Sequence, residues 1–305
     1  MVNGKDVILF AMATTKKKSS KAKTKTTKKS VTKATKTTKK SVSTKVTKES
    51  SKKSFINKLI RLNLLSAILA LALAAAAGFL MNNTSYQLFT GLLTNDELAS
   101  KTGTVFVPAI HSVFDLELRW AVVGILVLSA ILPLLAATRK RKQYEDSLAK
   151  KVMLWRWIDM AVISALMVEV IALLSGVQDV MTLKFIGAFV AITCVLGWFS
   201  EKRNANTPNT SWSNYILSLV TALLPWLMIG VYGVGTVLYG SVRSPWYVYA
   251  LYASTLLAFT AFFINGKRRL QAKQDYEVTE RNYLLLSIFA KTAFAVILIV
   301  GLYNN

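Results

Sequence analysis

Lys291 is the residue whose position most clearly needs a chemical explanation. It lies in the middle of residues 283–303, an otherwise uncharged apolar stretch, and about 20 such residues cross a bilayer as a helix. A lysine at mid-membrane depth costs about 3 kcal/mol on insertion scales. The amine therefore needs either an acidic partner or a covalent use, such as an imine formed with an aldehyde.

Asp159 is the acid that helix geometry places nearest to this amine. At about 1.5 Å of rise per residue, Lys291 lies roughly 15 Å and Asp159 roughly 12 Å from the same membrane face. Ser287, four residues before Lys291, shares its side of the helix and can hydrogen-bond the pair. From the residues alone, a chromophore with its counterion and a structural salt bridge in a transporter bundle both remain open.

Seven apolar segments can carry these groups, and we expect each to be a spanning helix. Their length and lack of alternation exclude barrel strands, and in lipid only a helix or a closed barrel satisfies its own backbone groups. The sequence thus predicts an all-α membrane protein with a seven-helix bundle. The segments are residues 55–81, 118–137, 152–175, 180–200, 215–239, 245–264 and 283–303.

The charge is concentrated before the first segment. The chain has a formal net charge of +23, and residues 1–58 contain 18 lysines and two acids. Residues 1–53, rich in Lys, Thr and Ser, cannot bury enough apolar surface to order, so we expect a disordered tail before a helical domain at 54–305. One cysteine and a lone histidine, His111, placed in a loop, argue against a disulfide framework, a metal site and an enzyme.

The loop charges predict the orientation of the bundle. Residues 139–151 contain six basic and two acidic groups, and residues 267–281 contain five and three, whereas the loop at 82–117 is acidic. Because Lys and Arg mark the cytoplasmic face, the N-terminus is expected in the cytoplasm and the C-terminus on the extracellular or lumenal side.

Other polar and aromatic groups within the segments admit two interpretations. Glu169 either packs beside polar groups or relays protons. Arg156 and Lys184 lie near helix ends and are expected to reach the interface. Trp226 either packs in the core or lines a ligand.

The order and spacing of several motifs between residues 58 and 303 resemble the heliorhodopsin family. The segment Leu286-Ser287-Ile288-Phe289-Ala290-Lys291 is similar to that family's retinal-attachment segment. Further similar motifs are Arg156-Trp157-Ile158-Asp159, Gly197-Trp198-Phe199-Ser200-Glu201-Lys202, Pro225-Trp226 and Tyr247-Val248-Tyr249-Ala250.

The resemblance implies that Lys291 binds all-trans retinal as a Schiff base and that Asp159 is the counterion. It further implies that Ser287 hydrogen-bonds this pair, that Ile163 and Met167 face the polyene, and that the protein forms a homodimer. The chain departs from the family in having Asp159 instead of Glu, Met160 instead of Tyr, and Glu169 instead of an aliphatic residue. Ala70 and Pro133 stand where the family has histidines.

These observations favour a light-sensing photoreceptor that signals slowly to a cytoplasmic partner. One alternative is a light-driven or light-gated proton transporter that uses Asp159 and Glu169. Another is a scaffold or transporter that does not respond to light. For the basic tail we favour association with anionic membrane lipids, or a solvated extension, over binding to nucleic acid.

Overall fold

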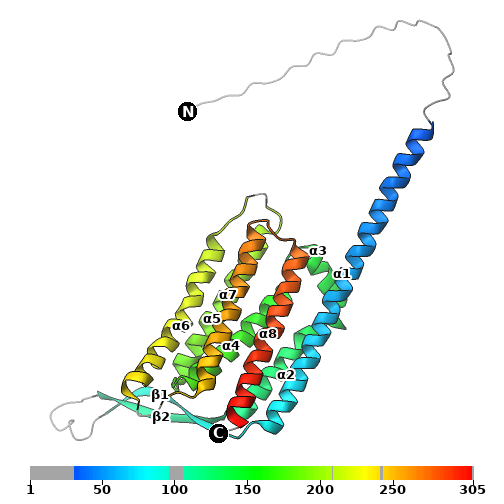
Figure 1. Cartoon of the computed structure of the whole chain (residues 1–305). Coiled ribbons are helices and arrows are strands. Elements are labelled where there is room, and N and C mark those ends of the chain that lie inside the picture. The colour runs from blue at the N-terminus through cyan, green and yellow to red at the C-terminus, as the bar shows by residue number, and fades with distance from the viewer. Residues whose placement is uncertain (1–30, 96–105, 208, 241–242, 304–305) are drawn as a thin grey trace, which may run out of the picture. The chain divides into compact units, whose positions relative to one another are not determined.

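The computed structural model describes residues 31–95, 106–207, 209–240 and 243–303, with the side chains of residues 31–52 left out. Two strands and eight helices follow one another along these ranges (Figure 1). In chain order they are α1 (Val31–Leu80), β1 (Ser85–Asn95), β2 (Phe106–Glu117), α2 (Leu118–Ala137), α3 (Arg141–Ala149), α4 (Leu154–Leu174), α5 (Val180–Asn204), α6 (Ser213–Tyr239), α7 (Trp246–Leu270) and α8 (Tyr276–Tyr303).

Seven of these helices are long and apolar enough to cross a membrane, counting the Lys53–Leu80 part of α1. All seven predicted segments are therefore confirmed as helices. Four of them, α5 to α8, run two to seven residues beyond the predicted ends on the side of the basic loops, whereas α4 lies within its predicted segment. The short helix α3 is additional, since it forms within the basic loop at 139–151.

The described chain divides into two units, residues 1–52 and 53–305. Helix α1 begins at Val31, within the segment 1–53 for which we expect disorder, and that expectation stays a prediction. Helix growth onto an existing apolar helix adds one hydrogen bond per residue without a new nucleus, which explains how a polar sequence can extend it. Residues 1–30, the rest of the predicted tail, lie outside the described residues.

Within the second unit, the helices run alternately up and down. Helices α4 and α5, α5 and α6, and α7 and α8 are neighbours, and α4 also contacts α2 and α7 (Figure 1). We call the end where α2, α5 and α7 finish and α4, α6 and α8 begin the basic end, and the opposite end the hairpin end.

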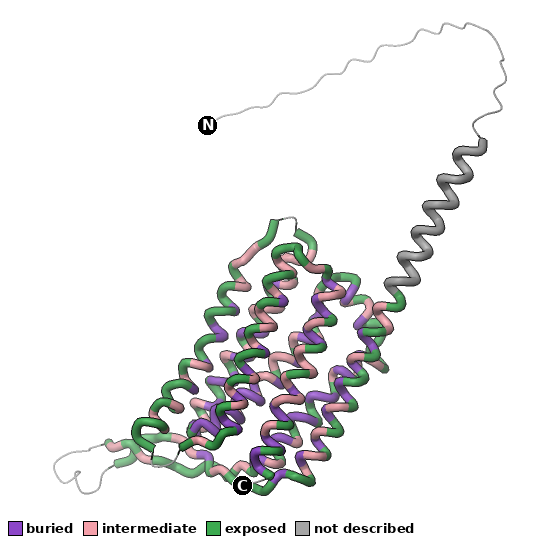
Figure 2. The backbone as a smooth tube through the Cα atoms, viewed as in Figure 1, coloured by how far each residue is buried: buried purple, intermediate pink, exposed green. Residues whose placement is uncertain are grey.

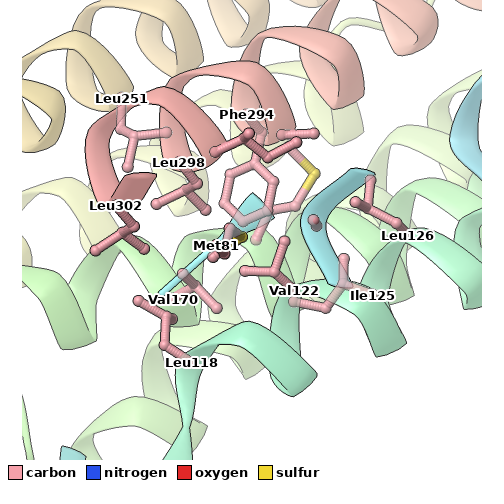
Figure 3. Close-up of a cluster of buried hydrophobic side chains, with 14 of the residues drawn as sticks. Met81, Leu118, Val122, Ile125, Leu126, Val170, Leu251, Phe294, Leu298 and Leu302 are labelled. Carbon is pink, nitrogen blue, oxygen red and sulfur yellow. The ribbon is translucent and has the colours of Figure 1, made fainter. Parts of the chain in front are cut away.

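The bundle interior is apolar, and its outward faces are apolar as well. Figure 3 shows side chains of four helices and Met81 meeting between the helices, among them Val122, Val170, Phe294 and Leu298. Buried residues line the inner sides of the helices in Figure 2, while many leucines and valines on the outer sides are exposed. An apolar outer surface suits lipid rather than water as the surrounding medium.

Strands β1 and β2 form an antiparallel hairpin at the hairpin end. The prediction of a loop at 82–117, with His111 in it, was therefore wrong for the described part of that segment: His111 lies on β2 and pairs with Thr90. β-Branched and aromatic residues favour this extended pairing. Phe89 N donates to Gln178 O (3.1 Å), which attaches the hairpin to the segment between α4 and α5.

Candidate functional site

Lys291 and Asp159 form a buried ion pair across the bundle. Lys291 Nζ lies 2.8 Å from Asp159 Oδ2, and the two residues are only 6% and 9% exposed. The pair joins α8 to α4, two helices that both start at the basic end. The similar depths estimated from the sequence are therefore matched by direct contact in the structure.

A third helix supplies a second acceptor for the amine. Lys291 Nζ donates to the backbone oxygen of Ser129 on α2 over 3.4 Å. In an α-helix that oxygen would accept from the N–H four residues later, but this position is Pro133, which has no N–H. The proline thus leaves one carbonyl of α2 free to face the amine.

A small cavity lies against the ion pair. Its volume is about 30 Å³, and Asp159 Oδ1 is buried beside it with no hydrogen-bond partner among the described residues. Residues of α4, α7 and α8 line it: Asp159, Met160, Ile163, Ser164, Met167, Val168, Thr255, Ala258, Phe259, Phe262, Ser287, Ala290 and Lys291. We call this the amine cavity.

The structure places most of the predicted site residues at this cavity. Ile163, Met167 and Ser287 line it. Trp226 does not, because it packs one layer away against Phe259 (ring centroids 6.2 Å apart) and Tyr252. Phe259 thus lies between Trp226 and the cavity, and contact of Trp226 with a ligand stays a prediction.

Glu169 lies apart from this site, towards the hairpin end of α4. Its Oε2 accepts from Lys184 Nζ on α5 over 2.7 Å, and its carboxylate packs against Gly187. Lys184, with a side chain 63% exposed, reaches outwards as expected. Glu169 lines neither of the two cavities described here.

Sequence reasoning missed a second charged cluster, centred on Arg156. The expectation that Arg156 reaches the interface was wrong, since it is buried between Glu201 of α5 and Glu280 of α8 and pairs with both. A buried guanidinium needs such partners because its desolvation is costly. Two spacings could have indicated the cluster: Arg156 precedes Asp159 by one helical turn, and Glu280 precedes Lys291 by about three.

The two carboxylates of this cluster are held by further donors. Glu201 accepts from the Tyr276 hydroxyl, the Trp157 indole N–H and the Met153 backbone N–H, the last over 2.9 Å. Glu280, which is fully buried, accepts from the Tyr144 hydroxyl over 3.4 Å. Burial raises the pKa of Tyr144 on α3, which keeps this hydroxyl protonated as a donor.

A larger cavity of about 320 Å³ connects this cluster with the loops of the basic end. Arg156, Glu201 and Tyr276 line it, as do loop residues such as Thr207 and Ala272. Four residues line both this cavity and the amine cavity: Met160, Ser164, Phe259 and Phe262. We call the larger one the basic-end cavity. The two are thus separated only by a thin wall of side chains.

Within the described ranges, no group of three His, Cys, Asp or Glu side chains is placed to hold a metal ion. The arrangement instead combines a buried amine, an acid with one free oxygen, and an apolar wall, which suits covalent attachment of an apolar carbonyl compound.

Known structures share this fold. The transmembrane domain of the Salpingoeca rosetta rhodopsin phosphodiesterase aligns at a TM-score of 0.58 and 14% identity, covering 84% of this chain and 87% of that one. A light-driven proton pump from Leptosphaeria maculans aligns at 0.59 and 15%, covering 82% and 97%. Halorhodopsin, a light-driven chloride pump, aligns at 0.54 and 15%, covering 82% and 96%. At these identities the likeness shows the fold alone.

The sequence comparison is more specific. No curated protein matches the chain significantly, but the heliorhodopsin family model matches residues 59–302. This confirms the resemblance seen in the sequence motifs. The protein belongs to the heliorhodopsin family, and it is thus an integral multi-pass membrane protein of the rhodopsin type, for which a retinal chromophore is implied.

Proposed function

We propose that this protein is a light sensor in which all-trans retinal is attached to Lys291. The observation that carries the proposal is the buried contact between Lys291 and Asp159 beside an apolar cavity. When bound, retinal supplies absorption of visible light and a change of shape on isomerisation. The chain itself supplies the attachment point, the balancing charge and the walls.

The residues present fit such a group chemically. Lys291 offers a primary amine, and the unpartnered Asp159 Oδ1 offers a further acceptor near it. At about 30 Å³ the amine cavity is far below the roughly 300 Å³ at which ligand pockets begin. Retinal therefore has to push side chains apart. Met160 and Met167 suit this, because methionine is unbranched and adapts its shape.

Asp159 and the Ser129 carbonyl hold a proton at the Lys291 nitrogen. Because the pair is buried in an apolar surrounding, its two charges interact more strongly than they would in water. A displacement of the nitrogen changes this interaction and with it the force between α4 and α8. The Arg156–Glu280 pair joins the same two helices nearer the basic end. A movement of α8 against α4 that starts at the nitrogen therefore also changes the geometry of this second pair. That end is where a signalling partner would bind.

The competing proposal is light-driven or light-gated proton transport through Asp159 and Glu169. Two proteins of similar structure, the Leptosphaeria maculans protein and halorhodopsin, are light-driven pumps. Against this route, Glu169 is already paired with Lys184 and lines neither cavity. Light-evoked current in voltage-clamped cells, removed by Glu169→Gln, would establish transport; a sensor gives no such current.

Lys291→Arg tests retinal attachment. It keeps a cation opposite Asp159 but cannot form the imine, so purified protein given retinal should show no visible absorption. Lys184→Arg is the matched control and should keep its colour. Colour that persists in Lys291→Arg, in protein whose unfolding resembles the wild type, would refute the attachment site.

The orientation and partners are proposed from the loop charges and the family. With Cys194 replaced by Ser, a cysteine at Thr210 should react with an impermeant maleimide from the cytoplasmic side only. One at Ser112, on the hairpin, should react from the opposite side only. A homodimer, and association of the basic tail with anionic lipid, belong to the same proposal.

A further inference from the structure

The Arg156 cluster contains more negative than positive charge. Glu201 and Glu280 both pair with the single guanidinium of Arg156, so the three groups together carry one negative charge when both acids are ionised. The side chains of Arg156 and Glu280 are 6% and 1% exposed, and that of Glu201 is 12% exposed. A buried net charge is costly, and two acids that share one counterion favour binding a proton.

The cluster is accessible to water from the basic end. Glu201 and Arg156 line the basic-end cavity, whose volume of about 320 Å³ can hold several waters, each occupying about 30 Å³ in the liquid. Hydroxyl groups of Ser164, Thr193 and Ser218 line the same cavity and can hydrogen-bond these waters.

The cluster is also close to Asp159. Arg156 and Asp159 are three residues apart on α4, about 4.5 Å of rise. Met160 and Ser164, which follow Asp159 on that helix, line both cavities together with Phe259 and Phe262. Between Asp159 and the basic-end cavity there is thus one layer of side chains for a proton to cross.

We propose that the Glu201–Arg156–Glu280 cluster is a proton-binding site that accepts, by way of Asp159, the proton released from the Lys291 nitrogen. The inference rests on the proposed function, because the nitrogen releases its proton only after light absorption. One N–H bond breaks and one O–H bond forms on a carboxylate of the cluster. The nitrogen loses its positive charge, the cluster loses its negative charge, and nothing is oxidised or reduced.

Several other groups face the two carboxylates and act on the same equilibrium. Lys151, Arg269 and the Arg156 guanidinium favour the ionised acids, while the tyrosines donate to them or stack on Arg156. The titratable and charged groups concerned are Tyr144 on α3, Lys151 before α4, Arg156 on α4, Arg269 on α7, and Tyr276 and Tyr283 on α8.

Glu169 does not compete as the acceptor. It is matched one to one by Lys184, so that pair carries no net charge to be neutralised. It also lies ten residues from Asp159 in the direction of the hairpin end. The excess negative charge is on the basic-end side of Asp159, and the basic-end cavity leads to it from the loops of that end.

The first experiment uses the retinal-free protein in lipid nanodiscs. Infrared titration with ¹³C-labelled glutamate should show a carboxylic-acid C=O band that grows as pH falls. In Glu201→Gln or Glu280→Gln the remaining acid has Arg156 to itself, so the midpoint should fall by more than about one pH unit, the mark of interacting sites. Glu145→Gln, at an exposed acid of α3, is the control and should leave the midpoint in place. A midpoint unchanged in both cluster variants overturns the proposal.

The second experiment uses the retinal-loaded protein and light-minus-dark infrared spectra. A light-induced carboxylic-acid band should disappear in Glu201→Gln or Glu280→Gln and persist in Glu145→Gln. A band removed by Glu169→Gln instead, or no band in the wild type, overturns the proposal. Failure of the proposed function would show differently, as a lack of colour with the titration of the retinal-free protein intact.

Discussion

Glu280 and Lys291 lie eleven residues apart on α8, about three helical turns, and each forms a buried ion pair with α4. Their partners, Arg156 and Asp159, lie one turn apart on α4. The two pairs have opposite polarity: α4 supplies a cation and then an acid, and α8 an acid and then a cation. If α8 slid along its axis relative to α4, at least one of the four charged side chains would lose its partner inside the bundle. The pairs therefore fix the register of the two helices.

Asp159→Asn should destabilise the retinal-free protein markedly. The substitution leaves the Lys291 ammonium buried without its acid, and loss of one partner of a buried pair costs about 3–5 kcal/mol. The free energy of unfolding, measured by denaturant titration in mixed micelles, tests this. The double variant Asp159→Leu with Lys291→Met removes both charges and should recover most of the loss. If the double variant is as unstable as Asp159→Asn, the pair is not what the single substitution breaks.

Arg156→Gln should lower the free energy of unfolding more than removal of either Glu201 or Glu280 does. It leaves the carboxylates of Glu201 and Glu280 close together without a cation, again at about 3–5 kcal/mol or more in the free energy of unfolding. Adding Glu280→Gln to Arg156→Gln should restore part of this stability, because one of the two like charges is gone. A purely additive loss in the double variant would show that the two groups do not interact.

Gly197→Ala should disturb the Arg156 cluster through packing alone. A Cβ at Gly197 would lie 2.5 Å from the ring of Trp157, whose indole N–H donates to Glu201. Overpacking of this kind costs about 1–3 kcal/mol in the free energy of unfolding. Gly124→Ala on α2 is the control, since a Cβ there meets nothing within 4 Å and should be neutral or stabilising. Equal stability of the two variants would contradict the close contact between α4 and α5.

Pro133→Ala should stabilise the helix yet shift the colour of the retinal-loaded protein. The new backbone N–H can donate to the Ser129 carbonyl, which then no longer accepts from Lys291 Nζ. Removing proline from a helix interior recovers up to about 3 kcal/mol. When the nitrogen has a weaker acceptor beside it, the positive charge of the nitrogen spreads further along the polyene. The absorption maximum should therefore move to longer wavelength. Pro225→Ala, in α6 and away from the amine cavity, should leave the maximum unchanged; an equal shift in both would contradict a role for Ser129.

Much of this protein is determined by the sequence itself. The bilayer admits only backbones that satisfy their own hydrogen bonds, so length and hydropathy were sufficient to place seven helices, although α5 to α8 extend two to seven residues further at the basic end. The depth of Lys291 and Asp159 followed from the rise per residue, because both helices start from the same end. Ser287 followed from its spacing of four residues from Lys291, whereas Ile163 and Met167 followed from the resemblance to the heliorhodopsin family.

Only the tertiary structure decided which helix faces meet. Glu201 lies at the end of α5 among lysine and arginine, and Glu280 before an arginine, so neither looks buried in the sequence; rotation of the helices turned both inwards towards Arg156. Trp226 packs against Phe259, which lines the amine cavity, and its place at the ligand stays a prediction. The pairing of β1 with β2 and the free carbonyl beneath Pro133 also depend on neighbours distant in the chain. Hydropathy places each residue along the membrane normal, whereas position around the helix axis is set by packing between helices.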